Sequence, residues 1–507
     1  MSITTAEPEL VVATAEGSVR GRVTDGVRTW RGIPYAAAPV GELRLRHPQP
    51  ARHWPGILDA GEFGPVPPQR RTGAMIGAGH GTPMSEDCLT INVSAPLSAA
   101  PQPRPVLVFF HGGAFSAGSA AVPAYAGTQL VRRGGVVYVS LNYRLGALGF
   151  LDFRRYSTPG RPFEANCGLA DQVAALRWVR RNIAAFGGDP ENVTIFGESA
   201  GGTSVTTLMC VPSAAGLFAK AFAQSPAPAS AYGPELPAQW AADFLSLLDV
   251  PEDGAAQALA TLPPEALVRA DTRLAHDVGP ARDPGTRSLA PVVDGEFLPE
   301  HPLDAFRAGR AQRVPLVIGT MAREGAFFDR LQDILPTTPD RLETMFTRTE
   351  PERRDQVLRG YPGFPGRKAA VEAGADAVFW WPSIQVAEAH ARHAPTWSYR
   401  FDYAPRLPRV LCLGATHGVD VPAVFGEYGS GPGRFLTLLG GRRTALAVSQ
   451  RFQGSLLRLA RTGHPGPIWP PYEPIQRITK IFDERDHIVL DPRRHRRLAW
   501  NGYRGYR

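Results

Sequence analysis

One serine of the sequence stands in a setting that could make it a nucleophile. Residues 193–202 read VTIFGESAGG, so that G-x-S-x-G runs from Gly197 to Gly201 with Ser199 at its centre. A nucleophile on a tight strand-to-helix turn needs neighbours without side chains, because the backbone must turn sharply while the hydroxyl stands clear. An apolar, strand-like run precedes this motif and a helix start follows it. We therefore interpret Ser199 as a nucleophile for acyl transfer.

A serine hydroxyl needs a base, usually a histidine that a carboxylate orients. On a turn of this kind the acid and then the histidine follow the serine along the chain. Glu324 lies in a loop after the apolar run 314–318, and His417 lies in the glycine-flanked segment 414–418, after the run 397–401. We assign Glu324 and His417 as the partners of Ser199. The competing acid, Asp402, ends a strand that precedes the histidine loop.

Other histidines also follow Ser199, but none lies in a glycine-flanked loop just after a strand, and we expect each to be a solvated surface side chain. They are His276, His301, His390, His393, His464, His487 and His495.

The segment 111–115, HGGAF, directly follows another apolar run and could stabilise an oxyanion. Preorganised backbone N–H donors do this in acyl-transfer enzymes, where the loss of one donor costs roughly 2.7–4 kcal/mol. We expect Gly113 and Ala114 to donate from this loop and Ala200 to donate from the position after the nucleophile, while Gly112 supplies the turn.

These residues must be positioned by a sheet. Short apolar runs at 106–110, 136–141, 193–196, 314–318 and 397–401 are typical of strands buried on both faces of a mostly parallel sheet. Between the second and third runs, apolar residues recur at helical spacing from Leu169 to Phe186 and stop at Gly187. The resulting β-α-β unit predicts an α/β fold with helices flanking the sheet.

The segments outside this sheet predict a small N-terminal sheet and two helical insertions. The segment 11–30 alternates loosely around glycines and predicts a small N-terminal antiparallel sheet. Helical patterns dominate roughly 226–313 and 337–395, which we interpret as insertions over the active site at the sheet's C-terminal edge. We find no repeat or low-complexity linker, so we expect one domain over residues 1–507.

Composition excludes several classes of protein. Of 507 residues, 43% are hydrophobic and 20% charged, which is typical of a globular chain, and the net charge is +8. The densest basic run, Arg493, Arg494, Arg496 and Arg497, follows no recognisable binding motif, so we expect a solvated surface and no nucleic-acid partner. No run of about 20 apolar residues occurs, so we expect no stable membrane association.

The four cysteines argue against a metal centre. Cys88, Cys167, Cys210 and Cys412 lie far apart without a C-x-x-C pair, and we expect free thiols. The chemistry inferred above needs no metal and no organic cofactor. The first ten residues have no basic or apolar leader pattern, which favours a cytoplasmic location.

Taken together, these motifs resemble the type-B carboxylesterases, which include cholinesterases, mammalian liver carboxylesterases, fungal lipases and bacterial p-nitrobenzyl esterases. The resemblance extends over nearly the whole chain. It rests on RGIPY at 31–35, SEDCL at 85–89, NYRLG at 142–146, NCGLADQ at 166–172, FGGDP at 186–190 and FGESAGG at 196–202. It implies an α/β-hydrolase fold with the triad and oxyanion donors assigned above, and it adds Glu198 and Ser225 as polar groups behind the triad. The chain resembles in particular the bacterial members without signal peptides.

The chain departs from the family pattern at three places. Secreted relatives pair the cysteine of the E-D-C-L segment with an earlier one, but proline stands in that position here, so the resemblance implies a free Cys88. The carboxylate three residues after His417 is commonly Glu and is Asp420 here, whose shorter reach is expected to weaken its polar contacts. The family's Ser-Gly becomes Ser225-Pro226, which is expected to reshape the pocket wall.

The sequence thus predicts a serine carboxylesterase that acts through an acyl-enzyme on a small-molecule ester. The H-G-G-A-F loop is similar to that of relatives accepting bulky alcohols. Alternatives left open are a carbamate, amide or biosynthetic lactone substrate for the same triad, and a non-catalytic, esterase-like binding protein. We expect a monomer or a homodimer.

Overall fold

The computed structural model describes residues 10–73, 77–332, 334–429 and 432–507. Among these residues, the main sheet has eleven strands in the order β14-β13-β12-β11-β10-β9-β7-β8-β6-β4-β3. Neighbouring strands from β8 to β13 are parallel, and the pairs at both edges are antiparallel. The carboxyl ends of the central strands therefore meet at one edge of the sheet.

The strands are β1 Val11–Ala13, β2 Ser18–Arg20, β3 Arg22–Thr24, β4 Val27–Pro34, β5 Ile57–Asp59, β6 Thr90–Pro96, β7 Arg104–Phe110, β8 Val137–Leu141, β9 Gly188–Glu198, β10 Lys220–Gln224, β11 Leu316–Met321, β12 Thr396–Phe401, β13 Ile478–Phe482 and β14 His487–Leu490. The helices are α1 Thr128–Gly134, α2 Ala147–Phe150, α3 Cys167–Asn182, α4 Ala200–Leu208, α5 Glu235–Leu247, α6 Ala255–Thr261, α7 Pro264–Arg273, α8 Gly279–Arg282, α9 Pro302–Arg307, α10 Gly325–Leu331, α11 Pro339–Arg348, α12 Arg354–Leu358, α13 Arg367–Ala375, α14 Trp381–His390, α15 Arg406–Val410, α16 Val421–Phe425, α17 Arg442–Thr462 and α18 Arg494–Trp500.

All five apolar runs form strands of the parallel region, as β7, β8, β9, β11 and β12. The largest difference is in β9, which begins at Gly188 because Arg104 of β7 already pairs there. The helix predicted before β9 is α3; it continues as a 3-10 turn to Phe186 and stops at Gly187, whose φ is 86°. The predicted α/β architecture is confirmed.

The N-terminal sheet is only partly as predicted. Strands β1 and β2 pair antiparallel, but β5 joins β2 in parallel, so the small sheet is mixed. Strands β3 and β4 belong to the main sheet instead. The reason is that β4 buries Val27, Trp30 and Ile33 and pairs along its length with β6.

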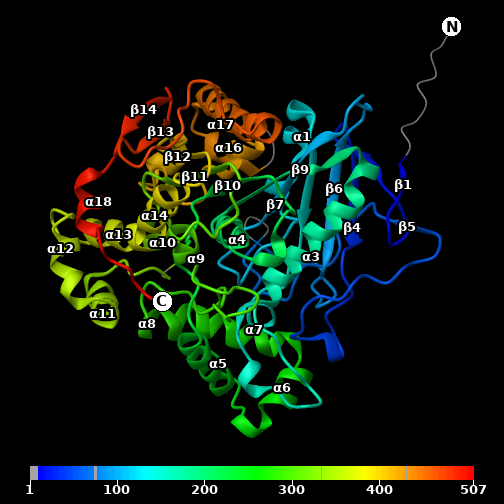
Figure 1. Cartoon of the computed structure of the whole chain (residues 1–507), viewed down its shortest axis with the longest axis horizontal. Helices are drawn as coiled ribbons and strands as arrows, with labels where there is room; N and C mark the ends of the chain where they lie inside the picture. The colour runs from blue at the N-terminus through cyan, green and yellow to red at the C-terminus, as the bar shows by residue number, and fades with distance from the viewer. Residues whose placement is uncertain (1–9, 74–76, 333, 430–431) are drawn as a thin grey trace.

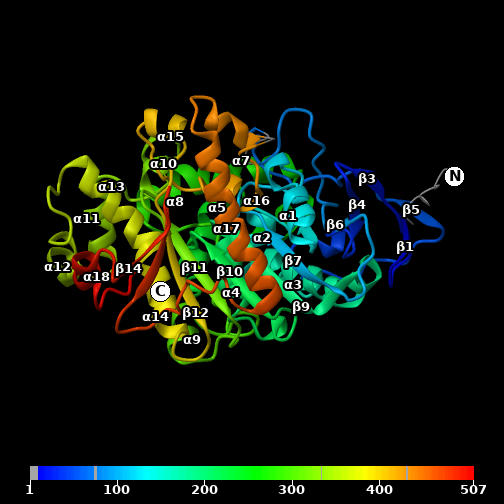
Figure 2. The same cartoon turned by 90° about the horizontal axis from the view of Figure 1, so that it is seen from above.

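Helices cover both faces of the sheet, as Figures 1 and 2 show. Side chains alternate between the two faces along a strand, and β7 illustrates the result. Val106 and Val108 share a buried cluster with α3, whereas Leu107 and Phe109 share another with α16 and α17. The central strands are buried on both sides, which explains their continuous apolar character.

Two helical stretches interrupt the strand sequence. Helices α5 to α9 lie between β10 and β11, with α5, α6, α7 and α8 along the lower part of Figure 1. Helices α10 to α14 lie between β11 and β12, and α11, α12 and α13 extend to the left. The single domain and the exact limits of its insertions stay predictions.

The basic run near the C-terminus is not the solvated surface that we predicted. Arg493 and Arg496 both form ion pairs with buried Asp376, at 3.1 Å each, and Arg497 pairs with Asp491 at 2.7 Å. Only Arg494 keeps a largely exposed side chain. Arg493 and Arg496 fasten the start of α18 to the π-helix Asp376–Trp380 that precedes α14, because burial of Asp376 requires paired positive charges.

Candidate active site

Ser199 lies on a sharp turn between β9 and α4. Its φ of 59° and ψ of −123° are unusual for a residue with a side chain. A Cβ atom on Gly201 would lie 2.0 Å from the carbonyl oxygen of Phe110, and one on Gly197 would lie 2.6 Å from the backbone of Gly201. The glycines of the motif are therefore required by the close approach of neighbouring backbone, as the sequence analysis argued.

The three side chains predicted to work with each other are brought together. His417 Nε2 lies 2.8 Å from Ser199 Oγ, and His417 Nδ1 lies 2.7 Å from Glu324 Oε2. Ser199 follows β9 and Glu324 follows β11, at the same edge of the sheet, and His417 reaches them from the long connection after β12. The His417 side chain is only 8% exposed. This is an unbroken hydrogen-bonded chain from hydroxyl to carboxylate.

Glu324 is held in place by two further donors. Its Oε1 accepts hydrogen bonds from Ser225 Oγ at 2.7 Å and from the Met321 backbone N–H at 2.8 Å. Ser225 follows β10, has a φ of 43°, and donates its own N–H to Gly319 O. A carboxylate with these donors presents its second oxygen to the imidazole in a fixed direction. Ser225, which the resemblance gave as a polar group behind the triad, thus contacts Glu324 directly.

The HGGAF loop folds back onto Ser199. A Cβ on Gly112 would lie 3.1 Å from Ser199 Cβ, and one on Gly113 would lie 2.0 Å from Ala117 O. Ala114 has a φ of 54°, and Gly113 has a φ of 116°. Within the described part of the chain, the N–H groups of Gly113, Ala114 and Ala200 have no protein acceptor. Two of these free donors lie on the HGGAF loop and the third directly follows Ser199, so all three are available to a developing oxyanion.

His111, the first residue of this loop, is buried and holds the loop in place. Its ring stacks on Tyr143 with centroids 4.4 Å apart, and the Tyr143 hydroxyl donates to His111 O at 2.7 Å. Burial lowers the pKa of His111 to about 4. It is therefore a neutral ring that fixes the loop, and not a base for the reaction.

Two more carboxyl groups lie near the hydrogen-bonded chain of Ser199, His417 and Glu324. Glu198 Oε1 lies 3.3 Å from His417 Nε2 without a hydrogen bond of good geometry, and Asp420 Oδ2 accepts from Gln224 Nε2 at 2.7 Å. Burial raises the pKa of both carboxyls, and their mutual repulsion adds to the rise at Glu198. Asp420 Oδ1 has no partner in the described residues, in line with the shorter reach expected of Asp.

The same carboxylates act on His417. Burial by itself lowers the pKa of the imidazole, but the charges of Glu198 and Glu324 and the hydrogen bond to Glu324 raise it more, so the pKa is raised overall. The surroundings therefore favour the imidazolium, which is the form that a base takes after it has removed a proton.

Aromatic side chains that the sequence analysis did not single out line the histidine. Phe328 and Phe379 lie 4.9 and 4.8 Å from the His417 ring, and Phe327 lies 6.4 Å away. Phe327 and Phe328 come from α10, and Phe379 comes from the π-helix Asp376–Trp380 before α14. We call these three rings the aromatic wall. No motif marks them, because their contact with His417 depends on how the helical segments pack.

The remaining candidates lie elsewhere. Asp402 pairs with Arg400 at 2.6 Å, so it is not the acid that contacts His417. The expectation that every other histidine is a solvated surface side chain is wrong for His301 and His390, which are buried. His390 Nε2 contacts Val314 O at 2.9 Å. All four cysteines are free, including Cys88 as expected.

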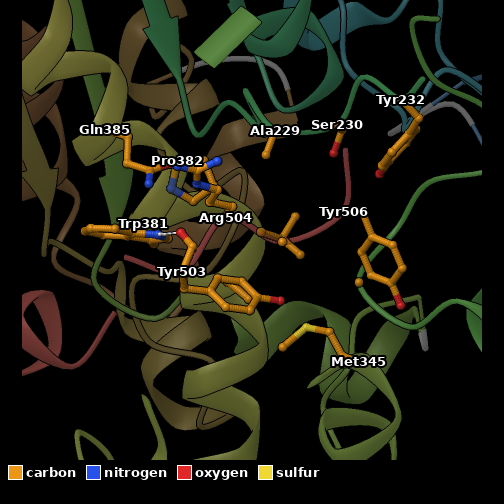
Figure 3. Close-up of a pocket in the computed structure, with 14 residues that line it drawn as sticks. Ala229, Ser230, Tyr232, Met345, Trp381, Pro382, Gln385, Tyr503, Arg504 and Tyr506 are labelled. Carbon is orange, nitrogen blue, oxygen red and sulfur yellow. Dashed lines mark hydrogen bonds between the residues drawn. The ribbon is translucent and has the colours of Figure 1, made fainter. Parts of the chain in front are cut away.

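A separate cavity lies beside the C-terminal segment (Figure 3). It is lined by Trp381, whose indole N–H donates to Tyr503 O at 3.1 Å, and by Met345 and Tyr506 among others. None of the predicted site residues lines it. Within the described ranges, no group of three or more His, Cys, Asp or Glu side chains is arranged to hold a metal ion, and no helix is long and apolar enough to cross a bilayer.

The fold and the site define an α/β-hydrolase, and the comparison with protein families agrees. Residues 8–360 and 364–492 match the model of the carboxylesterase family, so the chain belongs to that family and is a carboxylic ester hydrolase.

Individual relatives are similar over nearly the whole chain. The para-nitrobenzyl esterase of Bacillus subtilis (strain 168) is 36% identical over 501 residues, covering 96% of this chain and 97% of its own. The fumonisin B1 esterase of Sphingopyxis macrogoltabida is 35% identical, covering 86% and 79%. A solved structure of a PNB esterase superposes with a TM-score of 0.87 at 35% identity, covering 96% of this chain and 99% of that one.

Proposed function

We propose that the protein hydrolyses carboxylic esters through an acyl-enzyme intermediate, with Ser199 as nucleophile, His417 as general base and acid, and Glu324 as the carboxylate that orients the imidazole. The observation that carries this proposal is the continuous hydrogen-bonded chain Ser199 Oγ–His417–Glu324, with contacts of 2.8 and 2.7 Å. A base within hydrogen-bond reach of its nucleophile, itself oriented by a third group, is the geometry that covalent acyl transfer requires.

In the first half of the reaction, Ser199 Oγ attacks the ester carbonyl carbon while His417 Nε2 takes the hydroxyl proton. The carbonyl oxygen becomes an oxyanion, and the free N–H groups of Gly113, Ala114 and Ala200 are available to stabilise it. The tetrahedral intermediate then collapses. The bond to the alcohol oxygen breaks, His417 returns its proton to that oxygen, and the acyl group stays on Ser199.

In the second half, water takes the place of the alcohol. His417 removes a proton from water as the hydroxide adds to the acyl carbon, and collapse of this second intermediate returns the proton to Ser199 Oγ. Both halves pass through an imidazolium. The carboxylates of Glu324 and Glu198 stabilise that cation, which is why the raised pKa of His417 supports the proposal.

The substrate is proposed to be a small-molecule ester with an apolar part. The aromatic wall beside His417 suits such a group. A carbamate, an amide or a lactone would use the same atoms, so these stay alternatives, as does a non-catalytic binding role. The absence of a cofactor, a cytoplasmic location and a monomeric or dimeric state stay predictions.

The test is hydrolysis of p-nitrophenyl esters from acetate to palmitate by the wild type and by Ser199→Ala. We expect the wild type to cleave short esters, and the variant to lose a factor of about 10³ or more in kcat. Equal activity of two folded proteins would exclude Ser199 as the nucleophile. If neither protein hydrolyses any of these esters, the substrate would have to contain another acyl bond, such as a carbamate, an amide or a lactone. An unchanged circular dichroism spectrum of Ser199→Ala is the control for folding.

A further inference from the structure

Six large apolar side chains lie exposed on three segments close to the candidate active site. They are Leu331 at the end of α10, Val410 and Leu411 on and after α15, and Phe435, Leu438 and Leu439 on and after the 3-10 helix Pro432–Thr437. Their exposed fractions range from 48% to 66%. Single exposed apolar residues are ordinary, but a contiguous group marks an interaction surface. We call these six residues the apolar rim.

The three segments of the apolar rim are joined by direct contacts. Arg330, next to Leu331, donates to Leu411 O at 2.9 Å. Arg406 donates to Leu439 O at 3.3 Å, and α15 packs against the 3-10 helix Pro432–Thr437. The exposed side chains therefore belong to one surface, although they are up to about a hundred positions apart in the sequence.

This surface continues into the site. Helix α10 ends at Leu331, and its earlier residues Phe327 and Phe328 belong to the aromatic wall against His417. The loop after α15 runs to His417 within a few residues and is tied to the start of α10, because the Arg323 N–H donates to Ala415 O at 3.0 Å. Figure 2 shows α10 and α15 next to each other on the upper side of the molecule.

Basic side chains outnumber acidic ones around the apolar rim, and the two segments that carry five of its six residues have only basic charges. Residues 403–416 and 428–450 contain five arginines and no Asp or Glu. Arg409 pairs with Glu484 at 3.2 Å. The remaining arginines of these segments and of α10 are exposed, and within the described ranges none forms an ion pair with a carboxylate; they are Arg323, Arg330, Arg406, Arg434, Arg442 and Arg443.

We propose that the apolar rim docks reversibly on an anionic lipid surface, with its apolar side chains inserted among the acyl chains and its arginines on the headgroups. Apolar insertion combined with basic charge is the pattern that binds such interfaces, and each basic side chain near an anionic surface strengthens binding about fivefold. Docking brings the neighbouring catalytic site to the interface, where amphiphilic esters gather.

A second copy of the chain fits this surface less well. In a two-fold dimer the same patch faces itself, so unpaired arginines would meet arginines while losing water. An anionic lipid surface supplies the missing negative charge at every position. Such salt-sensitive docking is also weaker than the stable membrane association against which the sequence argues.

The experiment is flotation of the full chain with vesicles of phosphatidylglycerol and phosphatidylcholine, compared with vesicles of phosphatidylcholine alone, at low and high salt. Two patch variants are Val410→Asp/Leu438→Asp and Arg434→Glu/Arg443→Glu. Matched controls outside the apolar rim are Ile468→Asp/Ile475→Asp, whose side chains are 79% and 81% exposed, and Arg52→Glu. The wild type and Ser199→Ala are both tested, so that the result does not depend on the proposed catalytic role of Ser199.

We expect binding to the anionic vesicles only, weakened by high salt, lowered about 20-fold or more by each patch variant and unchanged by the controls. Hydrolysis of p-nitrophenyl acetate in solution should stay unchanged in the patch variants, which shows that they fold. Absence of vesicle binding, or binding that the patch variants do not reduce, overturns the proposal. So does sedimentation that shows a dimer dissociated by the patch variants, because the occupant is then a second copy.

Discussion

The carboxylate of Glu198 lies 3.3 Å from Nε2 of His417, the same nitrogen that bonds the Ser199 hydroxyl at 2.8 Å. Glu198 is the last residue of β9 and immediately precedes Ser199, and its side chain lies next to the imidazole. Nε2 of the ring thus faces both the Ser199 hydroxyl and the Glu198 carboxylate, and Glu324 contacts the other ring nitrogen. A cationic ring is compensated from both sides.

Glu198→Gln tests this relationship through the pH dependence of catalysis. Glu198 raises the pKa of His417, and the reaction needs the neutral imidazole, so activity rises as pH passes upward through that pKa. Removing the charge should shift the acidic limb of the kcat/KM profile to lower pH by about one unit. It should also lower the plateau, because the imidazolium of the transition state loses a charge partner. If the maximum of the kcat/KM profile falls but its acidic limb does not shift, Glu198 has a packing role and its charge does not act on His417.

Gly201→Ala tests whether the elbow requires its glycines. The added Cβ would lie 2.0 Å from Phe110 O, so β7 and the elbow must move apart. We expect the unfolding free energy to fall by about 1–3 kcal/mol and kcat/KM to fall sharply, measured by urea denaturation and ester hydrolysis. Gly160→Ala is the matched control, since a Cβ there meets nothing within 4 Å. Equal effects of the two substitutions would contradict the steric argument.

Asp271 gives a prediction about stability. It is buried, its Oδ1 accepts from the Ala147 N–H at 2.9 Å, and burial raises its pKa to about 7. A carboxyl whose pKa is higher in the folded than in the unfolded state lowers the free energy of unfolding as the pH rises between the two pKa values, here from about 4 to about 7. Asp271→Asn should therefore raise the unfolding free energy by roughly 2–4 kcal/mol at pH 8.

The stabilisation by Asp271→Asn should shrink as the pH falls toward 4, because the folded state keeps the carboxyl protonated there and the unfolded state begins to protonate it as well. Urea denaturation at pH 8 and pH 4.5 measures it, with exposed Asp253→Asn as the control. A gain that does not change with pH would show that the charge of Asp271 is not its cause.

Phe379→Leu tests the aromatic wall. The ring lies 4.8 Å from His417 and stacks on Phe328 at 5.6 Å, so it can contact a substrate held at Ser199. We expect kcat/KM for p-nitrophenyl butyrate, which has the longer acyl chain, to fall about tenfold, with a smaller effect on p-nitrophenyl acetate. The comparison of p-nitrophenyl acetate and butyrate gives the measurement, and Phe435→Leu, 57% exposed, is the control. A uniform loss on both esters would indicate a structural role.

The parts of the molecule that the sequence predicts are those in which the backbone itself is constrained. The buried strands read as continuous apolar runs because both of their faces are covered. The elbow and the HGGAF loop read as glycine patterns because backbone atoms lie within 3 Å of the missing side chains. Ser199, Glu324 and His417 could be selected because each follows a recognisable strand, and the parallel sheet gathers strand ends at one edge.

Other features depend on segments that only tertiary packing brings together. Strand β10 is short and alanine-containing, and it gave no strand signal, although it holds the centre of the sheet. The arginines at 493–497 form a basic run in the sequence that predicts an exposed surface. Asp376, more than a hundred residues earlier, nevertheless forms ion pairs with two of them. The aromatic wall and the apolar rim likewise have no local pattern.

The sequence by itself therefore determined the fold class and the family and selected the residues proposed to carry the chemistry, since each of these depends on local backbone geometry that particular residue types permit. Tertiary structure decided what surrounds His417, which charges are paired and which apolar side chains stay exposed. Those properties depend on distances between residues that are far apart along the chain. The order of the residues does not specify such distances, which are set only when the segments pack against each other.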